Sequence, residues 1–235
     1  NELYEQVIEN QVDDLLEDDD YYQMQSTPLK PATAVKQDHR RQLKEELEQK
    51  ELRNHIVRAH QLIMSELPQR IAPAEFDQLK KEFEKSFDHF NDIAEKGTLD
   101  QATSLQDVCG ISDQSVWHIY SLAYSLLEAK QYKDAQSVLS FLLLLDPMIS
   151  FFWTALGISL QGQAQFEESL PLFQIAQELN PSDPNPFVLG AQSAIQLNQK
   201  EEAQKQLDIA EQLLASSQSE NKEIASQIQA IKYQF

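Results

Sequence analysis

The chain has little of several residue types on which common protein activities depend. Its 235 residues include one cysteine, Cys109, and five glycines. A single thiol excludes a disulfide framework and a cysteine-based zinc site, and the glycines are not placed to form a phosphate-binding loop. We therefore expect a protein that works without a metal ion or a nucleotide cofactor.

Positive charge and long apolar runs are also scarce. Lys and Arg number 19 against 38 Asp and Glu, which gives a formal net charge of −19. Such a chain repels a phosphate backbone, so we expect no nucleic-acid partner. The longest apolar runs fall short of the ~20 residues that span a bilayer, and no secretory signal is visible. The sequence predicts a soluble protein of a reducing cytoplasm, without stable membrane insertion.

The titratable residues do not form a catalytic pattern. His55 and His60 are five residues apart, whereas a spacing of four aligns two metal ligands on a helix. Cys109 has no histidine near it in sequence to activate the thiol, and we expect His118 to be a surface histidine. The sequence therefore predicts that the protein is not an enzyme.

Residues 1–36 combine an acidic cluster, from Asp13 to Asp20, with the proline-broken stretch STPLKPATAVK. This composition buries too little apolar surface to offset the entropy of ordering, so it predicts a disordered acidic tail. The spacing Pro28-x-x-Pro31 would suit a polyproline ligand, but it is common in linkers, and we prefer the linker interpretation.

Residues 37–97 predict a helical N-terminal extension. Helix formers dominate the first part, Pro68 and Pro73 interrupt it, and Gly97 ends a second helix. That second helix carries an apolar stripe with the spacing of one helical face, which consists of Phe76, Leu79, Phe83, Phe87 and Phe90. We expect the repeats to cover the stripe as an intramolecular cap, and a homodimer interface through the N-terminal helices is the alternative.

Residues 98–235 contain a repeat with a period of 34 residues (156 − 122 and 190 − 156), preceded by a connecting segment at 98–110. The aligned positions are Leu122/Leu156/Gly190, Ala123/Gly157/Ala191, Leu126/Leu160/Ala194, Ala135/Ser169/Ala203, Leu139/Phe173/Leu207 and Leu142/Ala176/Ala210. This period is typical of tetratricopeptide repeats. Three isoleucines at helical spacing follow, at Ile224, Ile228 and Ile231. We predict an all-α fold with three tetratricopeptide-type helical hairpins, N-terminal helices and a C-terminal capping helix.

The first helix of each hairpin is expected to turn one face toward its partner helix and another toward a concave groove. The predicted groove residues are, repeat by repeat, Trp117, Tyr120, Tyr124 and Leu127; Phe151, Thr154, Ile158 and Gln161; and Asn185, Val188, Gln192 and Ile195. The groove is thus aromatic at one end and more polar at the other. Tyr and Trp are typical binding anchors, although Trp117 and Tyr120 would alternatively pack under the 73–96 helix.

Within residues 105–215 the sequence resembles the translocator chaperones of bacterial type III secretion, the SycD/LcrH family. The similar stretches are IYSLAYSLLEAKQYKDA (119–135), LLLLDP (142–147), FFWTALGISLQGQAQFEESL (151–170) and EEAQKQLDIAEQLL (201–214). The resemblance implies a chaperone that holds hydrophobic translocator proteins in the bacterial cytoplasm, with an extended client segment in the concave groove. It carries over Tyr120, Tyr124, Leu127 and Tyr132 as groove residues, with Leu145 nearby. Residues 1–95 exceed the short N-terminal helix of the family.

Two other binding functions are known for tetratricopeptide repeats. A general tetratricopeptide scaffold that binds a folded partner is the alternative. A co-chaperone that clamps a C-terminal carboxylate requires Lys and Asn where this chain has Tyr120 and Tyr124, and we discount it on charge.

Overall fold

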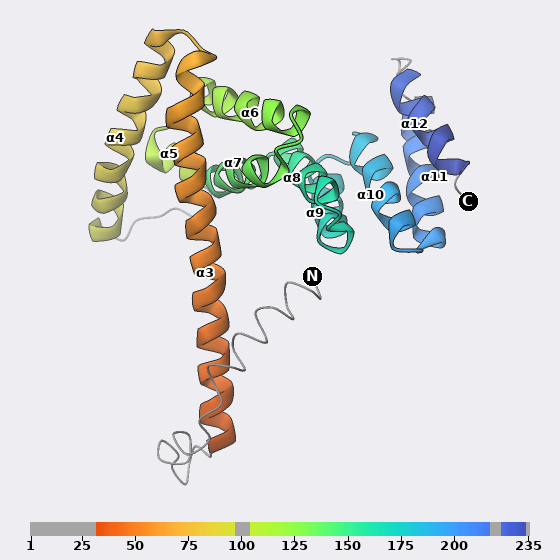
Figure 1. The fold of residues 1–235 in the computed structure, drawn as a ribbon, viewed down its shortest axis with the longest axis horizontal. Helices are drawn as coiled ribbons and strands as arrows, with labels where there is room; N and C mark the ends of the chain where they lie inside the picture. The colour runs from red at the N-terminus through yellow and green to blue at the C-terminus, as the bar shows by residue number, and fades with distance from the viewer. Residues whose placement is uncertain (1–31, 97–103, 217–221, 234–235) are drawn as a thin grey trace. The chain divides into compact units, whose positions relative to one another are not determined.

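The computed structural model describes residues 32–96, 104–216 and 222–233, whose path is drawn in Figure 1. The described residues form helices and no strand, which confirms the all-α class. The helices are α3 (Ala32–Glu66), the 3-10 helix η1 (Leu67–Gln69), α4 (Pro73–Lys96), α5 (Leu105–Cys109), α6 (Asp113–Glu128), α7 (Tyr132–Leu145), α8 (Ser150–Gly162), α9 (Phe166–Leu179), α10 (Asn185–Gln196), α11 (Lys200–Ser216) and α12 (Lys222–Lys232). Most of the expected acidic tail lies outside the described residues, and α3 begins at Ala32, within its last residues.

The chain divides into two compact units, residues 1–54 and residues 55–235. The second unit contains the last turns of α3 and all the helices that follow. Two apolar cores lie within it, one from the end of α3 to α8 and the other among α10, α11 and α12.

The described part of the phenylalanine stripe is covered by residues of the same chain. Leu79 is fully buried and Phe83 is 9% exposed. The Phe83 ring meets Phe141 of α7 edge to face, with ring centroids 5.9 Å apart. This packing is what an intramolecular cap requires. The side chains of Phe87 and Phe90 lie outside the described residues.

Three helical hairpins follow, α6 with α7, α8 with α9, and α10 with α11 (Figure 1). The turn inside each hairpin has a residue with positive φ, Lys130 at 57°, Ala164 at 60° and Asn198 at 58°. These turns are 34 residues apart (164 − 130 and 198 − 164). In each, the next residue donates its N–H to the carbonyl five positions back, as in Gln131 to Leu126 at 2.8 Å. This is the Schellman ending of a helix, so the turns follow the period found in the sequence.

Helix α12 packs on α10 and α11, and Ile224, Ile228 and Ile231 are all buried. The capping helix predicted from these isoleucines is therefore present.

The expected connecting segment at 98–110 contains a short helix in its described part, α5, which the sequence analysis did not anticipate. Ser104 caps this helix by accepting a hydrogen bond from the Asp107 N–H at 3.1 Å, and Gly110 ends it in the left-handed conformation at φ 64°. Both are standard helix-ending signals. The helix is short enough that apolar periodicity does not reveal it.

Candidate peptide-binding surface

Four aromatic side chains from two neighbouring repeats form one cluster, which we call the aromatic cluster: Trp117 and Tyr120 of α6, with Phe151 and Phe152 of α8. The Trp117 and Phe151 rings are stacked, with centroids 5.1 Å apart and planes 15° apart. The Tyr120 ring meets Phe151 at 4.9 Å and an interplanar angle of 67°. The two α6 rings contact each other, and both also contact rings of α8, the first helix of the next repeat.

Part of this aromatic surface faces solvent. Trp117 is 54% exposed and Tyr124, one turn beyond Tyr120, is 53% exposed. Met148, two residues before α8 begins, is 70% exposed and was not anticipated from the sequence. Because large apolar side chains are seldom left so exposed, the surface around Trp117 and Tyr124 is a candidate for binding an apolar partner.

Tyr120 is one of the two half-buried members of the cluster, and Phe151 is the other. Burial raises the pKa of its phenol, and the nearby Tyr124 adds to the increase. The phenol therefore stays protonated at neutral pH. A protonated phenol can both donate and accept a hydrogen bond, which suits a binding residue.

Three further predicted residues, Leu127, Tyr132 and Ile158, are half-buried. The Tyr132 ring lies directly over Gly162 at the end of α8, where a β-carbon would collide with it. Tyr132 thus fills the junction between the first two repeats. Ile195 is also half-buried, and it packs against the second core.

Two predicted groove residues do not lie on an open surface. Val188 is 1% exposed and belongs to the second core together with Ile224 and Ile228 of α12. The repeat register places Val188 with Tyr120 (188 − 68), but the capping helix packs on α10 and its isoleucines complete the core around Val188.

Leu145 is the second correction, since it is 2% exposed in the first core. It borders a separate apolar hollow of about 440 Å³ between α3, α4, α5 and α7, whose other walls include Val57, Phe83 and Phe141. Leu145 therefore belongs with the N-terminal helices and not with the aromatic cluster.

The far end of the predicted groove is polar. Gln161 of α8, Phe166 of α9, and Gln192 and Gln196 of α10 line a hollow of about 250 Å³. Gln161 donates to the Leu189 carbonyl and to Ser193 Oγ, both at 2.8 Å. The sequence analysis expects such a change from an aromatic to a polar surface along the groove, and the groove itself stays a prediction.

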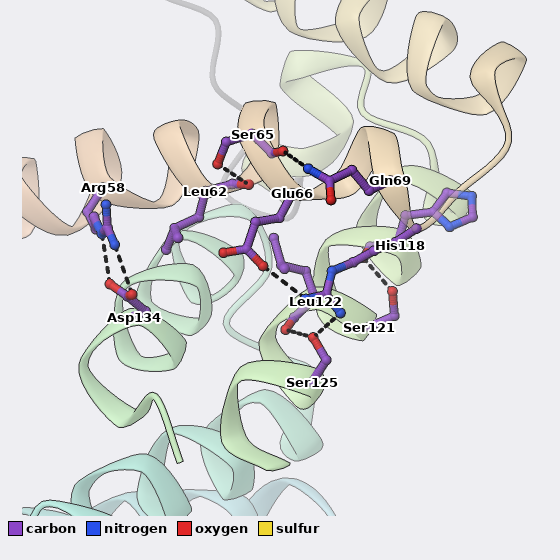
Figure 2. Close-up of polar contacts among 11 residues, drawn as sticks. Arg58, Leu62, Ser65, Glu66, Gln69, His118, Ser121, Leu122, Ser125 and Asp134 are labelled. Atoms are coloured by element: carbon purple, nitrogen blue, oxygen red, sulfur yellow. Dashed lines mark hydrogen bonds and ion pairs between the residues drawn. The ribbon is translucent and has the colours of Figure 1, made fainter. Parts of the chain in front are cut away.

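The N-terminal helices hold α6 and α7 in place. Figure 2 shows Arg58 of α3 facing Asp134 of α7. Beyond η1, Arg70 donates to Glu66 Oε2 at 2.9 Å and to Ser125 Oγ of α6 at 2.7 Å. These contacts fix the helix that carries Trp117, so the extension supports the candidate surface.

A buried carboxylate stands at the start of α6. Glu82 of α4 is 6% exposed, and its Oε2 accepts from the Ser112 N–H at 3.2 Å while Oε1 accepts from Gln78 at 2.9 Å. Burial alone would raise the pKa of Glu82. Hydrogen bonds from Ser115, Gln78 and Ser112 together outweigh burial, so the pKa is lowered and the charged carboxylate caps a helix N-terminus.

The described part of the chain has no group of three or more His, Cys, Asp or Glu residues that could hold a metal ion, and none of its helices is long and apolar enough to cross a membrane. Cys109 is buried, and burial raises the pKa of its thiol. A buried thiol with a raised pKa is a poor nucleophile.

Comparison with known proteins gives the same relationship as the sequence motifs. No family model matches the chain. It is 26% identical over 121 residues to low calcium response locus protein H (LcrH) of Yersinia pestis, a match that covers 52% of this chain and 71% of that protein. The resemblance to the SycD/LcrH family is confirmed.

Two solved structures show the same fold. The Yersinia enterocolitica type III secretion translocator chaperone SycD matches with a TM-score of 0.53 and 21% identity, over 56% of this chain and 98% of SycD. A T3SS complex from Aeromonas hydrophila matches with a TM-score of 0.52 and 20% identity, over 61% of this chain and 95% of that one. The helical repeat fold of a SycD-type protein is therefore present here.

Proposed function

We propose that this protein is a type III secretion chaperone that binds hydrophobic translocator proteins and sequesters them in the bacterial cytoplasm before export. The observation that carries the proposal is the exposed aromatic surface around Trp117 and Tyr124, beside a cluster that ties two repeats together. The relationship to LcrH and the fold shared with SycD, a translocator chaperone, support it.

The mechanism is reversible burial of apolar surface. Each Å² of apolar area removed from water contributes roughly 25 cal/mol, and Trp and Tyr provide large contact areas with few rotatable bonds. The rigid ring contacts of Trp117 and Tyr120 lower the entropy that binding must overcome. Such binding requires no nucleotide and no catalytic group, so the protein acts by equilibrium sequestration.

The test is a titration with the client peptide, defined as the fragment that stays protected from protease in the complex purified from the native host. Trp117→Ala and Tyr124→Ala should each weaken binding by about 2 kcal/mol, or roughly 30-fold, because each removes an aromatic anchor. Tyr233→Ala is the matched control. Tyr233 is 88% exposed and follows α12, so it lies outside the three repeats in sequence.

If both variants keep their helical circular dichroism and bind the peptide with unchanged affinity, the aromatic surface does not bind the client. The alternative function is a tetratricopeptide scaffold. It is favoured if the co-purified partner is a folded protein without long apolar segments.

Homodimerisation through the N-terminal helices remains a proposal as well. Leu79 and Phe83 are already buried by residues of the same chain, so a dimer would need other residues of α3 or α4.

A further inference from the structure

The apolar hollow of about 440 Å³ between α3, α4, α5 and α7 has a buried floor and an exposed mouth. Phe83, Cys109 and Ile111 are all buried and form the floor. Two other lining residues, Val57 and Leu144, are 52% and 37% exposed, although each is a large apolar side chain. The hollow is therefore a pocket that is open to solvent, and we call it the α3–α7 pocket.

The hydrogen-bonding groups of the lining lie at the mouth. His60 and Gln61, which follow Val57 on α3, are both exposed. The His60 ring lies above the floor, with its centroid 6.2 Å from that of the Phe83 ring. Within the described residues, neither His60 nor Gln61 makes a side-chain hydrogen bond. Because both side chains can donate and accept, the mouth can form hydrogen bonds with a ligand.

The lining favours a neutral ligand. None of its twelve residues is Asp, Glu, Lys or Arg, although these make up 24% of the chain. A charged group that enters such a pocket loses water without gaining an ion pair.

The volume of the pocket suits a small molecule. Sites for small molecules measure roughly 300–1,000 Å³, and an apolar cavity of about 150 Å³ is large enough to hold benzene. At about 440 Å³, the α3–α7 pocket has room for two aromatic rings or an apolar chain of similar size.

We propose that the α3–α7 pocket binds a neutral, mainly apolar small molecule, whose hydrogen-bonding group contacts His60 and Gln61 at the mouth. The apolar body of the ligand lies on the floor, where it removes the exposed sides of Val57 and Leu144 from water. No residue of the aromatic cluster lines this pocket. The site is therefore separate from the candidate peptide-binding surface and does not depend on the proposed function.

The small extent of the lining argues against a protein as the occupant. Specific protein interfaces use about 20–30 residues on each side, whereas twelve residues line the pocket and several of them are buried. A partner protein would need a wide apolar surface around the mouth. A small molecule needs only the pocket itself.

The pocket joins the N-terminal helices to the first repeat. Its walls include residues of α3, α4 and α5 on one side and of α7 on the other. A ligand that binds only this assembled form stabilises it by mass action. It adds to the contacts that Arg58 and Phe83 make with α7, so occupation of the pocket should raise the melting temperature.

The test is a calorimetric titration of the full chain with β-naphthol, a two-ring phenol that is neutral at pH 7. The dissociation constant should be on the order of 0.1 mM for a ligand of this size. Val57→Trp and Leu144→Trp fill the mouth, so each should weaken binding by about tenfold or more. His60→Leu with Gln61→Leu should weaken binding roughly fivefold, because the hydrogen bonds are lost. Leu52→Trp is the matched control, at an exposed apolar residue of α3 that does not line the pocket.

Alkylation of Cys109, the only thiol of the chain, gives a second readout that needs no substitution. Because Cys109 lies on the floor of the pocket, β-naphthol at about ten times its dissociation constant should slow alkylation by iodoacetamide roughly tenfold. β-Naphthoate has the same rings but carries a charge, so it should bind about fivefold more weakly or worse.

If Trp117→Ala abolishes β-naphthol binding while Val57→Trp and Leu144→Trp keep it, the ligand occupies the aromatic surface and the inference is overturned, although the proposed function stands. An unchanged rate of Cys109 alkylation at saturating β-naphthol likewise overturns it. The absence of binding at about 1 mM, ten times the expected constant, has the same consequence. Equal affinity for β-naphthoate would contradict the neutral class of the ligand.

Discussion

Arg58 of α3 and Asp134 of α7 form a two-point ion pair, with Nε 2.7 Å from Oδ1 and Nη2 2.8 Å from Oδ2. The two residues are 76 positions apart in sequence, and the pair joins the N-terminal extension to the first repeat. Because both side chains are partly exposed, at 47% and 28%, water and salt weaken the attraction. The two-point geometry makes it stronger than a single contact at the same exposure.

A double-mutant cycle with Arg58→Ala and Asp134→Ala should give a coupling free energy of about 0.5–1 kcal/mol in urea unfolding. Arg58→Lys keeps the charge but loses the fork, so it should recover less than half of this coupling. The coupling free energy should shrink as the salt concentration rises from about 0.05 M to about 0.5 M, because salt screens the attraction between partly exposed charges. A coupling of zero at low salt would mean that the pair does not contribute to holding the extension.

Glu82 should make the free energy of unfolding depend on pH in the acidic range. Its pKa is lowered from the ordinary value of 4.5 in the folded chain, so its stabilisation is present above the unfolded-state pKa and is lost as the pH falls through the folded-state pKa. Glu82→Gln should cost about 1–3 kcal/mol at pH 7, because it removes a buried acceptor from the start of α6. The difference from wild type should disappear in acid. A constant difference from pH 7 to pH 3 would contradict this assignment.

Phe83 distinguishes a cap from a dimer interface. With its ring against Phe141 and 9% exposed, Phe83→Asp places a charge in the first core and should lower the melting temperature by ten degrees or more, on the order of several kcal/mol. The particle mass should not change. A dimer that becomes a monomer of unchanged stability would instead assign Phe83 to an interface between copies.

The hairpin turns offer a stabilising change. Ala164 has φ 60°, which costs a residue with a β-carbon about 1 kcal/mol. Ala164→Gly should therefore raise the free energy of unfolding by about 0.5 kcal/mol, after the greater freedom of glycine in the unfolded chain is subtracted. Asn198→Gly is the matched control, since asparagine tolerates this conformation and should gain less. A loss of stability in Ala164→Gly would show that the turn is not strained.

The sequence predicted the elements that periodicity controls. The 34-residue register anticipated the helical hairpins and also pairs Trp117 with Phe151 (151 − 117), the two rings that stack. It failed where a neighbouring element decides the environment. Val188 has the register of Tyr120, yet α12 packs on α10 and closes the core around it.

The prediction for Leu145, which came from the family resemblance, fails for the same reason. Its position was carried over as close to the groove, but the extension and α5 build a different hollow around it. Periodicity gives the face of a helix, whereas the partner that covers that face depends on long-range packing.

In the second repeat, one core residue is smaller and another is larger than the corresponding residues of the first and third repeats. Positions 123, 157 and 191 are Ala, Gly and Ala, while positions 139, 173 and 207 are Leu, Phe and Leu. In the structure a β-carbon at Gly157 would lie 2.5 Å from the Phe173 ring, which is fully buried in α9. The Phe173 ring therefore fits only because residue 157 has no β-carbon, which explains why both positions differ in the same repeat.

Gly157→Ala should accordingly cost about 1–3 kcal/mol by overpacking, even though alanine favours a helix by about 1 kcal/mol. Adding Phe173→Leu should restore most of this loss, because it recreates the Ala–Leu pair of the first and third repeats. Ala123→Gly, which has no large ring opposite it, should lose stability through propensity and a small cavity. Urea unfolding of the wild type, of Gly157→Ala, of Phe173→Leu and of the double variant measures the coupling. If Gly157→Ala and Phe173→Leu add independently, the two positions are not in contact and the register between α8 and α9 is different from the one described.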